Sequence, residues 1–414
     1  MTEAPLAGVR VLAMEQAVAL PVATRHLADM GAEVIRVQSH ARGIPGLAEI
    51  DLTRNKRQLA LDLSLPGASE AFLRVAATCD VVAHNYTPRV VRQFGIDYEG
   101  VRAVKPDIIY VSLTGFGTTG PWGERPLFGP GAEAVSGHNE LIGETDSWPG
   151  RPGTIVYADT TCGLNAAFAI IAALEERDRT GLGQHIDVSL YETSVAQLGA
   201  VMVEAELGAS PARAGNNDAN FAIHGVFACR GLDRHLAIAV RHEQTTSVAE
   251  LLGLTEATDA AFAVAVREQD AGEVAALLQS RGIAASLVAD AADVAADPQL
   301  WARGFFGLVK RHLPGLEGTY PHAGPSWGGG PAVGMEESRA VGADSVAVLR
   351  ELGGYSQSEI EGLFENGVTG SPQPSTAPRA AGRERVRIER GELSRVDADH
   401  GRWRAAASAA GRLE

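Results

Sequence analysis

The sequence predicts an α/β protein in which helices cover a parallel β-sheet, joined to a smaller α+β domain. The first observation is that short apolar runs alternate with helical patterns between residues 8 and 189, as is typical of strand–helix–strand units. The second is a later block in which Ala-rich helical stretches separate two apolar strands, 235–240 and 285–288. The third is length: at 414 residues the chain exceeds what one hydrophobic core usually supports, so about two domains are expected.

The first half of the chain supplies the elements of the parallel sheet in order. Proline and glycine residues separate its apolar and amphipathic runs, and these residues are common at turns. An Ala-rich apolar helix is expected at 160–174, because a charged run followed by Gly181 and Gly183 ends it. The predicted strands are 9–14, 34–37, 81–83, 108–113 and 184–189, and the other predicted helices are 22–30 and 69–79.

Shifts in composition give the expected domain boundaries. The large domain is expected at 1–205, and the small domain at 225–330. Small and polar residues gather between them and predict a linker at 206–224. A tail is expected at 371–414. Its first part, 371–381, is rich in Pro, Ser and Ala and predicts a disordered spacer, whereas the Arg-rich remainder has no assigned role.

Charge and cysteine content exclude several classes of protein. The formal net charge of −15 at pH 7 disfavours a nucleic-acid partner. The three cysteines are widely spaced and form no CxxC pair, so a reducing, cytoplasmic location is expected. No signal peptide and no run of about 18 uncharged apolar residues is recognised, and so no membrane association is expected.

Common catalytic and cofactor motifs are missing or incomplete. Residues 115–120 spell GxGxxG after a predicted strand. No helix is expected to begin at the third glycine, and so the motif is not interpreted as a dinucleotide site. The 11 histidines form no HExxH or HxxxH pair, so no metal site is expected, and there is no GxSxG elbow.

Asp159 is the carboxylate of greatest chemical interest, because it lies between an apolar run and a hydrophobic helix. Two roles are open for it. It is either an ordinary helix N-cap, or a nucleophile that backbone N–H groups at the start of the helix orient and keep ionised. The two roles are compatible.

Basic residues are concentrated in the first hundred positions of this acidic chain. Such a cluster fits either a local phosphate-binding patch or a solvated face. Its members are Arg36, Arg42, Arg54, Lys56, Arg57, Arg89 and Arg92.

A series of short blocks follows along the chain: PLAGVRVL at 5–12, GAEVIRV at 31–37, RNKR at 54–57 with LDL at 61–63, VAHNY at 82–86, GFG at 115–117, TGLGQ at 180–184, GIAA at 282–285, DPQL at 297–300 and RGFF at 303–306. Their order resembles that of the class III CoA-transferase family. The similarity extends over about residues 5–368, and the shared order is more specific than any single motif.

The resemblance implies a Rossmann-like large domain built from both chain ends, to which residues 331–370 return, and a smaller middle domain. It also implies two subunits interlocked as a homodimer. Coenzyme A and acyl-CoA are expected as substrates of the large domain, and no tightly bound cofactor is expected. The family's catalytic aspartate begins the helix before the TGxGQ block, and Asp159 falls at that position. By similarity its carboxylate attacks the acyl-CoA thioester and forms an aspartyl mixed anhydride.

The resemblance also indicates which residues contact CoA. Ser39 and Gln93 fall where formyl-CoA transferase has arginines that touch CoA phosphates, and the adjacent His40, Arg42 and Arg92 are the residues that could substitute for them. The other residues expected at the CoA site are Val18, Ala19, Leu61, Asn85 and Tyr86.

Two alternatives to transfer remain open. The family includes α-methylacyl-CoA racemases, which need a second acid/base. Their Gly-His-Asp block is replaced here by Phe128-Gly129-Pro130, His138 is out of register, and His242 falls near the position of a further glutamate, so racemisation is disfavoured. The second alternative is a non-catalytic CoA-binding subunit of a hetero-oligomer, because Leu127–Pro130 lacks the polar groups that formyl-CoA transferase has there.

Overall fold

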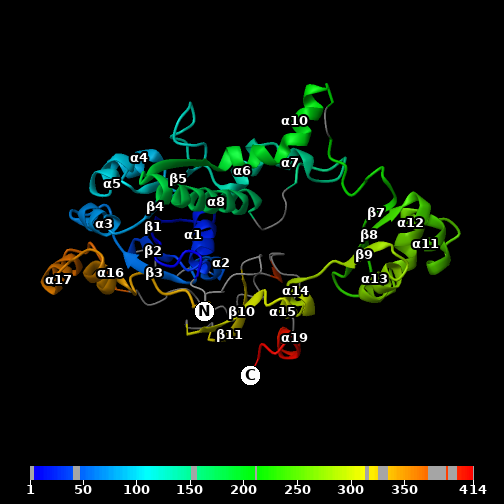
Figure 1. The fold of residues 1–414 in the computed structure, drawn as a ribbon. Helices are drawn as coiled ribbons and strands as arrows, with labels where there is room; N and C mark the ends of the chain where they lie inside the picture. The colour runs from blue at the N-terminus through cyan, green and yellow to red at the C-terminus, as the bar shows by residue number, and fades with distance from the viewer. Residues whose placement is uncertain are drawn as a thin grey trace. The chain divides into compact units, whose positions relative to one another are not determined.

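A six-stranded parallel sheet forms the centre of the larger part of the protein (Figure 1). The computed structural model describes residues 4–40, 47–150, 156–209, 212–312, 317–324, 334–371, 388–389 and 399–413. The strands lie in the order β3-β2-β1-β4-β5-β6, so the chain builds outward from β1 in one direction and then from β4 in the other. The sheet confirms the predicted α/β class. Its strands are β1 (Arg10–Met14), β2 (Glu33–Gln38), β3 (Lys56–Ala60), β4 (Val81–His84), β5 (Ile109–Thr114) and β6 (Gln184–Ser189).

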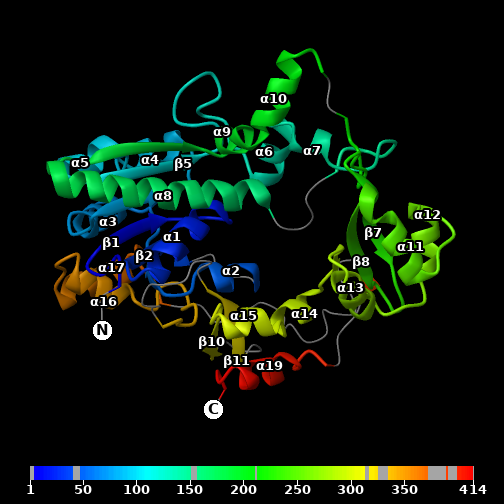
Figure 2. The same cartoon turned by 45° about the vertical axis from the view of Figure 1, so that its right-hand side comes forward.

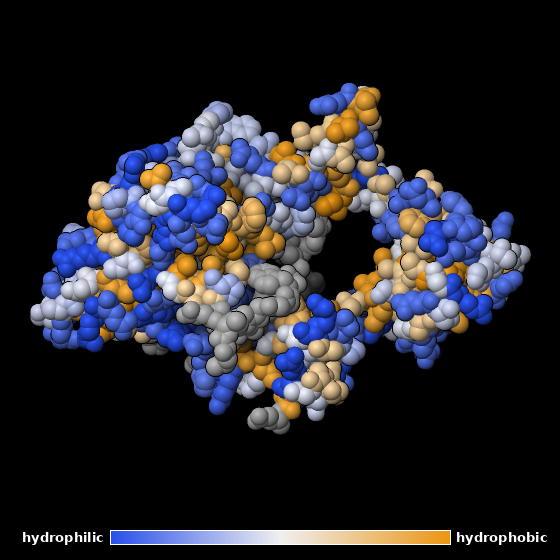
Figure 3. Space-filling view, viewed as in Figure 1, coloured by the Kyte–Doolittle hydropathy of each residue, from blue (hydrophilic) through white to orange (hydrophobic). Residues whose placement is uncertain are grey.

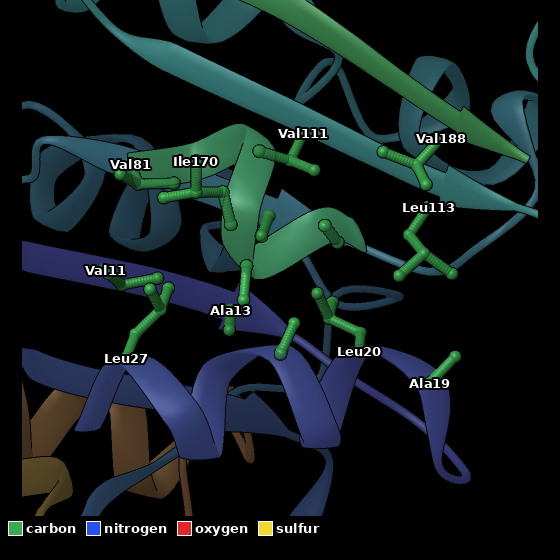
Figure 4. Close-up of a cluster of buried hydrophobic side chains, with 14 of the residues drawn as sticks. Val11, Ala13, Ala19, Leu20, Leu27, Val81, Val111, Leu113, Ile170 and Val188 are labelled. Carbon is green, nitrogen blue, oxygen red and sulfur yellow. The ribbon is translucent and has the colours of Figure 1, made fainter. Parts of the chain in front are cut away.

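Helices cover both faces of this sheet. Alternate residues of β1 enter different cores: Val11 packs with Leu27 and Ile170 on one face, and Leu12 packs on the other. Figure 4 shows the first core, between the sheet, α1 and α8. Burial on both faces is what makes these strands continuous apolar runs. The helices of this part are α1 (Ala19–Asp29), α2 (Leu47–Leu52), α3 (Ala68–Ala76), α4 (Pro88–Gln93), α5 (Tyr98–Val104), α6 (Gly129–Val135), α7 (His138–Leu141), α8 (Tyr157–Thr180), α9 (Leu190–Val195), α10 (Gly199–Glu206), α16 (Ser345–Glu351) and α17 (Gln357–Glu365).

Strand β3 is the strand of this sheet that the sequence did not predict, because it begins with charged residues. Lys56 pairs with Glu15 inside the protein, and Arg57 pairs with Glu33 and Glu351. Its outer edge is hydrogen-bonded by residues of the C-terminal return: Asp344 accepts from the Gln58 N–H, Ser345 accepts from the Ala60 N–H, and Thr369 donates to the Ala60 carbonyl oxygen. Residues about 285 positions away in sequence thus complete the edge of the sheet.

Helix α8 is the longest helix described, with 24 residues. It begins three residues before the predicted 160–174, and Gly181 ends it with a positive φ of 72°. By length and composition it is the one described helix that could cross a membrane. It packs along α1 (Figure 2), and half of its most apolar window is buried. A helix in the core of a globular protein meets the same criteria.

A second unit contains a three-stranded antiparallel sheet of order β7-β8-β9, with β7 (Phe221–Ala228), β8 (His235–Arg241) and β9 (Ala284–Leu287). Phe262, Val274 and Leu278 pack against this sheet in a core of their own. The predicted strands at 235–240 and 285–288 are therefore confirmed to within one residue. The helices of the unit are α11 (Thr245–Leu252), α12 (Asp259–Val266), α13 (Ala271–Gln279), α14 (Ala291–Ala295), α15 (Pro298–Ala302) and α19 (Trp403–Ala409).

The unit boundaries differ from the predicted domains. The large unit comprises 1–139, 151–210 and 304–381, and the second unit comprises 140–150, 211–303 and 382–414. Residues 304–330, predicted in the small domain, belong to the large unit, where β10 (Phe306–Arg311) and β11 (Gly318–Ala323) form a hairpin. The reason is local: His322 of this hairpin bonds to Asp51 at 2.8 Å. Most of the predicted spacer at 371–381 lies outside the described residues.

The C-terminal helix α19 packs on α15 within the second unit. The rings of Trp301 and Trp403 stack with centroids 5.9 Å apart, and both side chains are buried. Arg402 donates to Asp293 at 2.9 Å, beside the ion pair that Arg234 makes with the same carboxylate. The unassigned tail thus provides a packed helix of the second unit.

Replacing Trp403 with alanine is expected to destabilise the protein by about 3 kcal/mol, because it removes a buried ring and exposes Trp301. Urea unfolding followed by tryptophan fluorescence measures the change. Trp148→Ala is the matched control, since Trp148 belongs to the same unit and is 90% exposed. Equal stability of the two variants would contradict the packing role of α19.

Candidate active site

The loop between β1 and α1 lies at the point where the strand order reverses. In open parallel sheets, ligands bind at such a point, outside the carboxyl ends of the strands. Asn85, which follows β4, braces this loop: its side chain accepts from the Gln16 N–H and donates to the Gln16 carbonyl oxygen, each at 2.8 Å. Ala17 has a positive φ of 52°, a conformation that non-glycine residues seldom adopt. The loop therefore has a fixed and unusual shape.

Close packing of α8 on α1 brings Asp159 to this loop. A Cβ atom at Gly163 would lie 2.5 Å from the Ala19 carbonyl oxygen and 2.8 Å from the Val22 Cβ atom. Only glycine allows the two helices to approach so closely. Asp159 is four residues before Gly163 and so lies on the same face of α8. This geometry places its carboxylate at the beginning of α1.

The Asp159 carboxylate accepts backbone N–H groups of Ala19 and Gly129. Both donors begin other helices, α1 and α6, so Asp159 is not the cap of its own helix. The N-cap of α8 is Val156, whose side chain makes no capping bond, and Asp159 lies in the first turn. The N-cap interpretation is therefore wrong, whereas orientation by backbone donors is present in a different form.

A second carboxylate, Glu133, caps α8 in place of Asp159. Its Oε1 atom accepts the Tyr157 N–H at 2.8 Å and the Ala158 N–H at 3.4 Å. Glu133 is fully buried, although its sequence neighbourhood shows no sign of a special role. A cap formed by a residue 24 positions earlier depends on tertiary contacts, so local sequence patterns do not reveal it.

Burial raises the pKa of Asp159 from 3.8 to about 6, and the charge of Glu133 adds to this rise. The N–H groups of Ala19 and Gly129 act in the opposite direction, because they stabilise the ionised form. With a pKa of about 6, roughly nine tenths of the groups are ionised at pH 7. The carboxylate is thus available as a nucleophile, and more basic than an exposed aspartate.

Gly129 leaves no space for a side chain beside Asp159. A Cβ atom there would lie 1.9 Å from the Asp159 Oδ2 atom and 1.9 Å from the Val156 Cγ1 atom. The segment Leu127–Pro130 has no polar side chain. Instead its backbone approaches Asp159 directly, and the Gly129 N–H group serves as the donor.

A mainly apolar cavity of about 180 Å³ opens beside the same edge of the sheet. It brings together three of the predicted CoA-site residues, Ser39, Leu61 and Tyr86. Met14, the last residue of β1, also lines it, so the loop 15–18 joins the cavity to Ala19 and Asp159. The remaining lining residues are Val37, Gln38, Asp62, Leu63, Ser64, Val90, Val91, Phe94 and Ile96.

The other predicted CoA-site residues are not all free to bind a ligand. Val18 is half-buried at the start of α1, and the Ala19 N–H is bonded to Asp159. Arg92 is exposed and pairs with Glu124. Arg42 lies outside the described residues.

Three members of the basic cluster, Arg36, Arg54 and Lys56, form internal ion pairs, whereas Arg89 and Arg92 are exposed. Arg36 and Lys56 are buried and share the carboxylate of Glu15. Arg54, also buried, binds Asp29 at 2.6 Å. The partners of each pair are far apart in the sequence, and so the distribution of charges along the sequence does not reveal the pairing.

The other sequence signals have no catalytic geometry. After β5, residues 115–123 form turns, and the next helix is α6, so the expectation that no helix starts at the third glycine of GxGxxG is confirmed. Among the described residues, no three His, Cys, Asp or Glu side chains are grouped as metal ligands. The three cysteines are buried free thiols; the reducing, cytoplasmic location stays a prediction.

In sequence and in fold, the chain is similar to known proteins of one family. The family model described as CoA-transferase family III matches residues 6–336. The chain is 31% identical to the succinyl-CoA:glutarate CoA-transferase of Mus musculus, over 88% of this chain and 90% of the mouse protein. It is 33% identical to the succinate–glutarate CoA-transferase of Agrobacterium fabrum, over 62% of this chain and 68% of that protein. The crystal structure of a CAIB/BAIF family protein from Brucella suis superposes with a TM-score of 0.75 and 28% identity, covering 85% of this chain and all of that one.

Proposed function

The chain belongs to CoA-transferase family III, and on that premise we propose that it moves coenzyme A from an acyl-CoA to a carboxylic acid with Asp159 as the nucleophile. The observation that carries the proposal is the environment of Asp159. The residue is 7% exposed, and its carboxylate is held by two backbone N–H groups at the edge of the sheet where ligands bind in this class of fold.

The chemistry follows from a carboxylate in that position. Asp159 attacks the thioester carbonyl carbon, the carbon–sulfur bond breaks, and the products are an acyl-aspartyl anhydride and the CoA thiolate. The thiolate then attacks the aspartyl carbon, releases the donor acid and leaves a thioester on Asp159. The incoming acid attacks this thioester and reverses both steps. The N–H groups of Ala19 and Gly129 lie where charge develops on the aspartyl oxygens.

We place the nucleotide end of CoA in the cavity lined by Ser39, Leu61 and Tyr86. The apolar lining and the aromatic side chains of Tyr86 and Phe94 suit a flat heterocycle. From there the pantetheine arm would follow the loop 15–18 to Asp159. We assign Arg92, which follows the cavity residues Val90 and Val91, to a CoA phosphate that takes the place of its exposed partner Glu124.

The names of the relatives suggest the acids to test first. Succinyl-CoA is the donor to combine with glutarate and other dicarboxylic acids, with product acyl-CoA followed by liquid chromatography and mass spectrometry. We expect a new acyl-CoA in equimolar amount to the succinate released. Release of free CoA without a new thioester, for every acid tried, would contradict transfer. The relatives reported above are named as transferases, which favours transfer over racemisation.

We further propose that the protein is a homodimer. Two helices of the large unit expose large apolar side chains: Phe168 on α8 is 75% exposed, and Met202 and Val203 on α10 are more than half exposed. Figure 3 shows apolar surface over α10. Exposed apolar helices of this kind often mark subunit interfaces. Native mass spectrometry tests the state, and a monomer at micromolar concentration would contradict it.

A further inference from the structure

Glu133 lies on the side of α6 that faces Asp159. Gly129, the first residue of α6, donates its N–H to Asp159, and Glu133 follows four residues later on the same face of the helix. The side chain of Glu133 is fully buried. One short helix thus presents a backbone donor and a carboxylate to the beginning of α8.

The carboxylate of Glu133 also holds the backbone of α8. The first N–H groups of a helix have no partner within the helix, and the Val156 side chain supplies none here. Glu133 accepts two of these groups, those of Tyr157 and Ala158. Asp159 is the next residue, so the position of the first turn determines where its carboxylate lies.

Burial raises the pKa of Asp159, and the charge of Glu133 raises it further, because a like charge in a low-dielectric interior disfavours ionisation. The other titratable groups around this point are on α7 and α8. His138 lies near Glu133, which opposes the lowering of its pKa by burial. Cys162 is kept in its thiol form by burial, which raises its pKa to about 12.

We propose that Glu133 is a positioning residue for CoA transfer: its Oε1 atom fixes the first turn of α8, and its buried carboxylate acts on that of Asp159, the third residue of this turn. This inference rests on the proposed role of Asp159 as the nucleophile. A more basic carboxylate is a stronger nucleophile. The charge of Glu133 also limits the ionisation of Asp159 at low pH. It therefore sets the lower end of the pH range in which the enzyme works.

The test separates charge from capping with two substitutions. Glu133→Gln removes the charge and keeps an oxygen acceptor for Tyr157 and Ala158, whereas Glu133→Met removes both. We expect both variants to move the titration of Asp159 to lower pH by about one unit. The titration is measured by carbon-13 NMR with labelled aspartate, and Asp159 is assigned by comparison with Asp159→Asn. For a shift of one unit, the ratio of transfer rates at pH 5 and pH 8 rises about five-fold.

The matched control is Glu175→Gln, an exposed glutamate further along α8, which is expected to leave the titration unchanged. If Glu133→Gln titrates as the wild type does and only Glu133→Met differs, Glu133 is a cap alone and the proposal is wrong. The NMR measurement needs no turnover. A shifted titration in a protein without transferase activity would therefore contradict the proposed function and leave the effect of Glu133 established.

Discussion

Replacing Asp159 with asparagine is expected to lower the rate of CoA transfer by at least about a thousand-fold. The amide has the size of the carboxylate but cannot attack the thioester, so the anhydride does not form. Steady-state assays with succinyl-CoA and the best acceptor acid measure the loss. Asp178→Asn is the matched control, because Asp178 is exposed near the other end of α8; it should retain the wild-type rate.

The same variant should be more stable than the wild type at neutral pH, so loss of activity cannot be ascribed to unfolding. The folded pKa of Asp159 is raised from 3.8 to about 6. A carboxyl group of this kind stabilises the fold fully below pH 3.8, and this stabilisation is lost as the pH rises through about 6. At pH 7 the shift corresponds to roughly 3 kcal/mol as an upper limit. Urea unfolding should show that Asp159→Asn has a higher free energy of unfolding than the wild type at pH 7, and that the difference is smaller at pH 4.5.

Replacing Gly129 with alanine is expected to lower the transfer rate by about a hundred-fold or more. The new Cβ atom would lie 1.9 Å from an Asp159 oxygen, so the carboxylate must turn away or α6 must retreat, and in either case the Gly129 donor is lost. A loss of about 1 to 3 kcal/mol in stability is also expected, as for overpacked cores.

Gly131→Ala is the matched control for this steric effect. Gly131 lies in the same helix, and a Cβ atom there would closely meet only the Leu127 Cδ1 atom, at 2.8 Å, which can rotate aside. This variant should keep most of the activity and gain the same helix propensity. If Gly129→Ala were as active as Gly131→Ala, the start of α6 would have no role in holding Asp159.

Much of the large unit could be predicted because its strands are buried on both faces. Strand β6 has the predicted bounds 184–189, β1 and β4 differ from prediction by one residue at one end, and β5 is shifted by one residue at both ends. Strand β3 was missed because Lys56 and Arg57 read as solvated charges. Their partners are Glu15, which directly follows β1, and Glu33, which begins β2, and only the parallel order of the sheet brings them together.

The candidate site was also predictable only in part. The family resemblance identified Asp159, and its apolar surroundings made a buried carboxylate plausible. The supporting contacts were not predictable, because they join α8 to α1 and α6 at positions far apart in the chain. Gly163 and Glu133 carry no local signal: a glycine in a helix is usually a weak point, and a glutamate between alanines is usually exposed.

The most direct measurement is to trap the acylated enzyme with hydroxylamine during turnover of succinyl-CoA and to map the modified peptide by mass spectrometry. The account predicts a hydroxamate on Asp159, absent from Asp159→Asn and absent without acyl-CoA. The acylated enzyme should last long enough to be trapped, because the site is buried and water is largely excluded. A hydroxamate on Glu133, or rapid transfer by an enzyme in which Asp159 is never modified, would contradict the claim that Asp159 is the nucleophile.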